Sequence, residues 1–370
     1  MTRKGKQLEM YSASMLLSLH MAAKRDFGSF HSSNVQETYK YSREFPNNYI
    51  LSYNVQIYMC SNFPSQSDVH AVLYYHKDYI PPLFPFQIPE YDFGSLDSLQ
   101  FGKECREKCF MLEEDCTFIN HGAFGGVLKD ALDIAQKWQR YIERQPLRFF
   151  DRELLPHLVY VTRRLSKFIG CDAQDVVLVT NATTAINTVV RSAVKKLLRQ
   201  VCTETGTVLQ EEKVEFPVTG KQQIISLVKS TLKSGTKLAV FDHIPSNSPL
   251  ILPIKEIIQV CHERNVPVLI DGAHALGSVP LNLRSLDADY YVSNAHKWFC
   301  CPKGAAFLYV RKDLQKSTRP LVISHGFGSG FNSEFIWAGL HDYSPFLAMH
   351  VVLNFWEGIG STKIQQYMCQ

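Results

Sequence analysis

Short apolar runs alternate with segments of helical periodicity between residues 110 and 310 of this chain. The runs predict strands, at residues 175–180, 237–241, 266–270, 288–292 and 305–310. The segments between them predict helices, at residues 128–141, 154–169, 183–198, 221–233 and 254–264. A run that is apolar throughout is typical of a strand covered by helices on both faces, because it has no solvent-facing side. The alternation therefore predicts an α/β fold, with a mostly parallel sheet flanked by helices.

Polar residues follow four of the expected strands, at residues 180–184, 242–247, 271–274 and 293–298. Ligands of an open parallel sheet bind beyond the carboxyl ends of its strands, so these four loops are expected to form one site. Small residues after Thr180 open the next helix and can leave backbone N–H groups free for a phosphate. The same Asn and Thr residues equally suit a simple helix cap, and both interpretations stay open.

Asp271 ends an apolar run and is expected to be buried. A buried carboxylate needs a cation or a strong donor, which a salt bridge or a protonated pyridine nitrogen can supply. Lys297 follows the next strand, where enclosure lowers the basicity of its amine. An acid and then a lysine in this order suit pyridoxal phosphate, because the acid keeps the ring nitrogen protonated and the lysine holds the aldehyde as a Schiff base. The order therefore favours a lysine-bound cofactor.

Composition excludes several classes of partner. The net charge of +4 is spread along the 370 residues without a basic block, which argues against nucleic acid. The longest apolar stretches fall short of the roughly 20 residues that cross a bilayer, and residues 15–23 lack a convincing signal cleavage site. The ten cysteines are scattered, which predicts a reducing, intracellular and cytoplasmic setting.

Two regions of the chain differ in composition and in periodicity. Residues 1–100 are aromatic-rich and irregular, and we expect them to be partly disordered, with residues 74–92 as an extended arm in the alternative. Residues 101–370 form the predicted α/β domain. Cys105 and Cys109 have a spacing that suits a metal, but no second pair follows at finger-like distance. A helix with two thiols on one face is the stronger interpretation, and no metal site is predicted.

From residue 101 onward the chain resembles class V aminotransferase-like proteins of the fold-type I pyridoxal phosphate superfamily, in the isopenicillin N epimerase-like and cysteine desulfhydrase-like branch. The motifs that carry the resemblance lie at residues 118–125, 181–184, 242–243, 271–274, 296–298, 302–304, 324–326 and 334–337. The resemblance implies the large-domain fold of that superfamily, pyridoxal 5′-phosphate as cofactor, a small amino acid substrate and a homodimer.

Roles follow from the resemblance by matching position. Lys297 is expected to be the Schiff-base lysine, Asp271 the partner of the pyridine nitrogen, and His274 a neighbour of the ring hydroxyl. The expected phosphate-binding residues are Ala182, Thr183, Asn294 and His296, with Ser246 as a less direct member of the cofactor shell. The loop toward substrate is expected to contain Asn120, His121 and Gly122. In such enzymes the cofactor is an electron sink for a carbanion at the α-carbon, a step shared by epimerisation, transamination and β-elimination of sulfide.

Three departures from the family bear on activity. Relatives have a further strand at this point, and a residue that stacks on the cofactor ring. Residues 201–214 are too few to supply them, as if roughly twenty residues were absent. Leu340 stands where relatives have a phosphate-binding threonine, and its side chain cannot donate a hydrogen bond. The sequence stops at Gln370, before the small carboxyl-terminal domain of the relatives. The chain thus looks internally shortened and C-terminally truncated.

Two functions are open at this point. One is a pyridoxal phosphate-dependent lyase, epimerase or transferase acting at the α-carbon of an amino acid, which Asp271 and Lys297 support. The other is a catalytically impaired relative or truncated isoform acting as a binding or regulatory protein, which the departures support. A nucleotide-binding doubly wound domain is disfavoured, because no Gly-x-Gly-x-x-Gly run follows the first strand and no Walker-type loop occurs.

Overall fold

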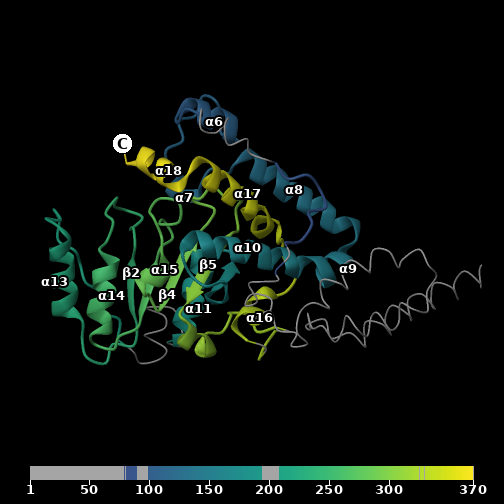
Figure 1. Cartoon of the computed structure of the whole chain (residues 1–370). Coiled ribbons are helices and arrows are strands. Elements are labelled where there is room, and N and C mark those ends of the chain that lie inside the picture. Colours follow the sequence, from purple (N-terminus) through teal and green to yellow (C-terminus); the bar gives the residue numbers. More distant parts are fainter. Residues whose placement is uncertain are drawn as a thin grey trace, which may run out of the picture.

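A computed structural model describes residues 79, 81–89, 99–193, 208–324, 326–328 and 330–369. Helices surround one sheet in this part of the chain (Figure 1). Its strands are β1 (Val176–Val179), β2 (Ala239–Asp242), β3 (Val268–Asp271), β4 (Tyr290–Asn294) and β5 (Ala306–Val310). Their order across the sheet is β1-β5-β4-β3-β2.

Four of the five strands run in one direction. β2, β3 and β4 pair in parallel, whereas β5 is antiparallel to both β4 and β1. β1 therefore points the same way as β4, and β5 alone is reversed. The carboxyl ends of β1, β2, β3 and β4 consequently share one edge of the sheet, and the register sets Asp242 beside Asp271 there. The expected α/β class with a mostly parallel sheet is confirmed.

Apolar side chains on both faces hold the sheet between helices. Along β4, Tyr290 and Val292 belong to one buried cluster and Tyr291 to another, because successive side chains of a strand point to opposite faces. Helix α11 (Ala182–Ala193) covers the first face, together with Phe331 of α16 (Phe331–Ile336). The second face is covered by α8 (Lys129–Arg144), α10 (Leu154–Ile169), α14 (Ile254–His262) and α17 (Ser344–Ile359).

The remaining helices are short or peripheral. They are α6 (Lys103–Cys109), α7 (His121–Phe124), α9 (Pro146–Arg148), α13 (Lys221–Thr231), α15 (Leu283–Leu286) and α18 (Ser361–Met368). Figure 1 shows α6 and α18 near each other, and the Phe101 and Tyr367 rings stack at 4.7 Å. Within the described residues, no helix has both the length and the apolarity needed to cross a membrane.

Local sequence explains the helix boundaries well. The buried residues of α10 include Leu154, Leu158, Val161, Leu165 and Ile169, whose spacing of three and four places them on one face. The helix ends where Gly170 adopts a left-handed conformation and its N–H bonds to the last turn. The other predicted helices are also present, as α8, α11, α13 and α14, and residues 194–198 of the third lie outside the described part.

Two regions singled out in the sequence are described only in part. Residues 1–78 of the predicted irregular region lie outside the described residues, while residues 81–89 form no helix or strand. Here Phe84 stacks on His350 at 4.5 Å and Phe86 contacts Trp138 at 4.9 Å, so this stretch lies on the domain. Residues 201–207 of the predicted shortened stretch also lie outside the described part. Residues 208–220 contain no strand, and β2 has no second strand partner among described residues.

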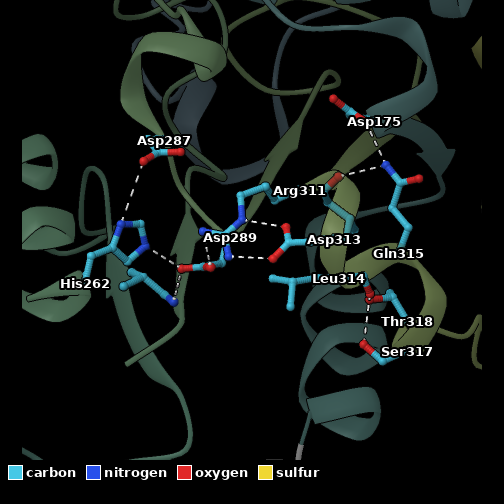
Figure 2. A network of polar contacts seen from close by, with 12 residues as sticks. Asp175, His262, Asp287, Asp289, Arg311, Asp313, Leu314, Gln315, Ser317 and Thr318 are labelled. Atoms are coloured by element: carbon cyan, nitrogen blue, oxygen red, sulfur yellow. Dashed lines mark hydrogen bonds and ion pairs between the residues drawn. The ribbon is translucent and has the colours of Figure 1, made fainter. Parts of the chain in front are cut away.

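A buried carboxylate joins three elements at the opposite edge of the sheet (Figure 2). The Asp289 side chain accepts the Val268 N–H at 2.7 Å, lies 2.8 Å from Nε2 of His262, and pairs with Arg311 at 2.7 Å. Asp289 is 1% exposed, and a buried carboxylate is stable only when paired in this way. The network therefore sets β3, β4, β5 and α14 in their relative positions.

Candidate functional site

Lys297 and His274 are in direct contact at the carboxyl edge of the sheet. Lys297 Nζ lies 3.0 Å from His274 Nε2, and Trp298 Nε1 donates a hydrogen bond to His274 Nδ1 at 3.3 Å. Because Nδ1 accepts this bond, a neutral imidazole carries its proton on Nε2 and donates it to the Lys297 amine. Such a bond requires Lys297 to be neutral, with a free lone pair.

The electrostatic surroundings favour the same protonation state. Burial lowers the pKa of Lys297, and the Asp271 carboxylate partly opposes this effect. Burial also lowers the pKa of His274, and positive charge on Lys297 lowers it further. Both side chains are thus biased toward their neutral forms. The neutral amine is the nucleophilic form of a lysine.

Asp271 presents a partly unpaired carboxylate beside this lysine. Its Oδ1 accepts the Ala273 N–H at 2.9 Å, while Oδ2 has no hydrogen-bond partner among the described residues. Burial raises the pKa of Asp271, which the Ala273 bond and Lys297 partly offset. Burial and the neighbouring Asp271 together raise the pKa of Asp242. A cationic group at Asp271 would therefore be stabilising.

The start of α11 is bonded to the end of β4. Asn294 Oδ1 accepts the Ala182 N–H at 2.8 Å, and Asn181 Oδ1 caps the helix by accepting the Thr184 N–H at 2.8 Å. The Ala182 and Thr184 N–H groups are therefore satisfied within the protein. The exposed Thr183 keeps an N–H that has no acceptor among the described residues. Capping and anion binding are thus compatible here, through different backbone groups.

His296 follows Asn294 by two residues, and one of its ring nitrogens is fixed by a hydrogen bond. Its Nδ1 bonds to the carbonyl oxygen of Ala305 at 2.9 Å, so Nδ1 carries the proton and Nε2 stays available in the neutral ring. Burial lowers the pKa of His296, the Ala305 bond raises it, and Lys303 and Lys297 lower it.

The loop that contains Asn120, His121 and Gly122 packs directly on the lysine loop. A Cβ at Gly122 would lie 3.1 Å from the His274 ring, so the Gly122 backbone covers that imidazole. Asn120 Oδ1 caps α7 through the Ala123 N–H at 3.2 Å, and His121 Nδ1 accepts the Gly126 N–H at 3.1 Å. The predicted substrate loop is therefore brought to Lys297.

Gly125 anchors this loop. Its φ is +73°, and a Cβ there would lie only 1.8 Å from the His296 carbonyl oxygen. Lys303 Nζ donates to the Gly125 carbonyl oxygen at 3.1 Å. The two loops are thus in backbone contact. A side chain larger than that of glycine at position 125 would prevent this contact.

Ser246 makes no hydrogen bond to the described residues around Lys297. It is exposed in the loop after β2, and no hydrogen bond links it to Asp271, His274 or Lys297. Leu340, predicted as a departure from the family, is 71% exposed.

Sequence reasoning missed the residues that support the site from within. Tyr291 is fully buried, and its hydroxyl lies 2.7 Å from His243 Nδ1, whose pKa burial lowers to about 4. A Cβ at Gly272 would lie 2.4 Å from that hydroxyl, so Gly272 is required beside Asp271. Tyr291 lies in an apolar run that carries no signal for such a role. Trp298 and Lys303 belong to noted motifs, but their contacts depend on the folded loops.

Comparison with known proteins agrees with this geometry. Residues 158–331 match the aminotransferase class-V family model. The chain is 34% identical over 270 residues to L-cysteine desulfhydrase from Arabidopsis thaliana, covering 64% of this chain and 60% of that protein. It is 25% identical over 292 residues to isopenicillin N epimerase from Amycolatopsis lactamdurans, covering 70% and 73%. The chain thus spans less than two thirds of the length of the plant protein.

Solved structures show the same fold. The apo cysteine desulfurase from Thermococcus onnurineus superposes with a TM-score of 0.61 at 17% identity, covering 72% of this chain and 73% of that one. A C-DES mutant with glycine covalently linked to its PLP cofactor gives a TM-score of 0.61 at 20% identity, covering 72% and 77%. Residues 158–331 therefore match an aminotransferase class-V domain, on a fold that the chain shares with pyridoxal phosphate enzymes, as the motifs around Asp271 and Lys297 predicted.

Proposed function

We propose that this protein binds pyridoxal 5′-phosphate and acts at the α-carbon of an amino acid, as a lyase of the cysteine desulfhydrase type. The contact between Lys297 Nζ and His274 Nε2 at 3.0 Å carries the proposal, because it keeps a lysine amine neutral beside the Asp271 carboxylate. A surface lysine would instead be protonated and unreactive at neutral pH.

The residues present fit the cofactor. The unpaired Oδ2 of Asp271 suits a protonated ring nitrogen, and the neutral Lys297 suits covalent attachment to an aldehyde. The free N–H of Thr183 and Nε2 of His296 suit the phosphate, with Asn294 holding the Thr183 turn in place through Ala182. When bound, the cofactor supplies an electron sink for negative charge at the substrate α-carbon.

The protein's own residues then position groups and move protons. The Nε2–H of His274 donates to the Lys297 amine and orients it as a neutral base, so that Nζ could accept a proton from the α-carbon. Trp298 keeps His274 in the tautomer that this requires. The backbone at Gly122 covers the His274 ring and limits the access of water to it.

A sulfur-containing amino acid is the proposed substrate class. The support is similarity, since four plant relatives named as L-cysteine desulfhydrases are 30–34% identical to this chain. A structural neighbour is a cystine C-S lyase in complex with cysteine persulfide. Elimination of a sulfur leaving group from the β-carbon follows the same loss of the α-proton.

We also propose that two copies of the chain associate. Apolar side chains between β5 and α17 are unusually exposed: Leu321, Val322, Ile323, Phe327 and Leu340, at 41–71%. Two of them, Leu321 and Val322, line an apolar cavity of about 430 Å³ beside β1. A patch of this kind is typical of a protein interface.

Light scattering should give twice the chain mass, and the Ile323→Lys variant should be monomeric. A monodisperse wild-type monomer well above micromolar concentration would contradict the dimer.

An intracellular location completes the proposal. All eight cysteines among the described residues are free thiols, which is typical of a reducing compartment. Fractionation of cells, with antibody detection of the protein, tests this placement; recovery from the secreted fraction with oxidised thiols would oppose it.

An absorbance scan with added pyridoxal phosphate tests the central claim. We expect a visible band that borohydride removes, present in the wild type and absent in Lys297→Ala. Lys255→Ala is the control, because it removes an exposed lysine of α14 outside the site and should keep the band. A folded wild type without a band would refute cofactor binding and favour a non-catalytic relative. A band without release of sulfide from cysteine would refute only the substrate class.

A further inference from the structure

Cys105 interacts electrostatically with two other thiols, Cys109 and Cys300, of which Cys300 lies in the loop that carries Lys297. Cys105 and Cys109 are four residues apart on α6 and therefore share one face of that helix. Cys105 is buried, whereas Cys109 is half-buried. The buried Cys300 lies close enough that a charge on it would raise the pKa of Cys105. Within the described residues, no group of three or more His, Cys, Asp or Glu side chains is arranged to hold a metal ion.

The two α6 thiols differ in character. They hydrogen-bond to each other, and the bond from Cys105 lowers the pKa of Cys109. Burial and Asp130 raise the pKa of Cys109, whereas Lys129 and Lys108 lower it. For Cys105 the same bond and its burial raise the pKa. The pair thus combines a half-buried thiol of lowered pKa with a buried thiol of raised pKa, the arrangement of a reactive cysteine beside a resolving one.

A path of backbone contacts runs from Cys109 to Lys297. Phe110 follows Cys109 and forms a β-bridge with Leu128. The Leu128 N–H donates to the Cys300 carbonyl oxygen at 3.2 Å, and the Cys300 N–H donates to the Lys297 carbonyl oxygen at 3.2 Å. Cys300 has φ of +63°, a conformation that a residue other than glycine adopts only under constraint. A shift at the end of α6 would therefore act, through these contacts, on a residue of positive φ three positions after the lysine.

We propose that Cys105 and Cys109 form a reversible disulfide in response to peroxide, and that its formation rearranges the loop of residues 295–301. Residues four apart in a helix have Cα atoms about 6 Å apart, within the roughly 4.4–6.8 Å that a disulfide spans. Their Cβ atoms are about 5–6 Å apart, beyond the roughly 3.5–4.5 Å that the bond requires, so it forms only if the backbone at one cysteine shifts. Cys109 is the last residue of α6, so its turn can adjust without disrupting the helix interior. That adjustment moves Phe110, whose ring lies 5.8 Å from the His121 ring.

The chemistry balances in two steps. The Cys109 thiolate attacks one oxygen of hydrogen peroxide; the S–O bond forms, the O–O bond breaks, and the departing hydroxide takes a proton to become water. Cys105 sulfur then attacks Cys109 sulfur; the S–S bond forms, the S–O bond breaks, and a second water leaves with the Cys105 proton. Two thiols are oxidised and one peroxide is reduced to two waters. A small dithiol reverses the reaction by exchange.

Peptide mapping tests the disulfide in the full-length protein. Trypsin cuts after Lys103, Arg106, Lys108 and Lys129, so Cys105 and Cys109 fall in separate peptides, the second of which also contains Cys116. The Cys116→Ser variant is therefore the working protein. After peroxide and alkylation we expect peptides 104–106 and 109–129 to be disulfide-linked, and dithiothreitol to separate them. In the double variant that also carries Cys105→Ser, dimedone should instead trap a sulfenic acid at Cys109. Alkylated, unlinked peptides after peroxide would overturn the proposal.

Hydrogen exchange tests the coupling to the lysine loop. Amides of residues 295–301 should exchange faster after oxidation of Cys116→Ser, and should not change in the protein that also carries Cys105→Ser. A disulfide without faster exchange would overturn the coupling. Neither readout needs a bound cofactor, so this proposal and the proposed function fail separately.

Discussion

The Lys297 amine and the His274 imidazole share one hydrogen bond of 3.0 Å, and Trp298 decides its direction. The indole N–H can only donate, so Nδ1 of His274 must accept and Nε2 must donate. The protonation state of Lys297 therefore depends on Trp298. The two residues are adjacent in sequence, but the indole ring acts on the lysine only through His274.

Removing the indole N–H should weaken cofactor capture. In Trp298→Phe the ring remains but His274 is free to change tautomer, and we expect roughly fivefold weaker pyridoxal phosphate binding near neutral pH, the value of about one hydrogen bond. The pH at which the visible band appears should also rise, because Lys297 then deprotonates at higher pH. Titration of the band over pH measures both effects. Trp337→Phe, remote from His274, should change neither; equal effects in the two variants would contradict this role.

Asp271→Asn should be far more damaging than the neighbouring Asp242→Asn. Breaking a buried charge pair costs about 3–5 kcal/mol, which corresponds to at least roughly 100-fold weaker binding of the cofactor. Asp242 is more exposed than Asp271, although still partly desolvated, and its neutralisation removes a like charge, so binding should stay within a few-fold of the wild type. Fluorescence titration with pyridoxal phosphate compares them. Similar losses in the two variants would place the ring-nitrogen partner elsewhere.

Gly125→Ala should destabilise the fold by more than its backbone angle alone explains. The new Cβ would meet the His296 carbonyl oxygen, whereas Gly235 has a similar φ of +80° with nothing within 4 Å of its Cβ position. Gly235→Ala therefore measures only the left-handed strain, on the order of 1 kcal/mol. Urea unfolding should show a clearly larger loss for Gly125→Ala. Equal losses would mean that the loop moves aside freely.

Two buried histidines should make the fold sensitive to acid. Burial lowers the pKa of His157 to about 3 and of His350 to about 4, with smaller contributions from His350 and Arg164, respectively. The unfolded chain has histidine pKa values near 6.5. Below that pH the unfolded state binds more protons than the native state, so the free energy of unfolding should fall as pH decreases from about 6.5 toward about 4, by a few kcal/mol in total.

The His157→Leu variant isolates this effect. Nδ1 of His157 has no hydrogen-bond partner, so replacing the ring with leucine breaks no hydrogen bond at that atom. We expect a smaller loss of stability between about pH 6.5 and pH 5 than in the wild type. Urea unfolding at several pH values measures the slope. An unchanged slope would mean that other groups cause the acid sensitivity.

Several features of the fold were predictable because they depend on local pattern. The helix predicted at 154–169 is α10 with the same bounds, since its apolar spacing and Gly170 act within one segment. Strands were located to within two residues at their ends. The reversed direction of β5 was not predictable, because an apolar run carries no information about which way its chain enters the sheet.

The sequence by itself determined which chemical groups follow which strand, and in what order: a phosphate-type turn, an acid and a lysine. Strand periodicity and polar loops are properties of neighbouring residues, so they can be read directly. Only the tertiary structure decided that His274 contacts Lys297, that the Asn294 side chain accepts the Ala182 N–H and that the Leu128 N–H bonds to the Cys300 carbonyl oxygen. These contacts join residues distant in the chain, and strand order, loop packing and burial bring such residues together only when the whole domain folds.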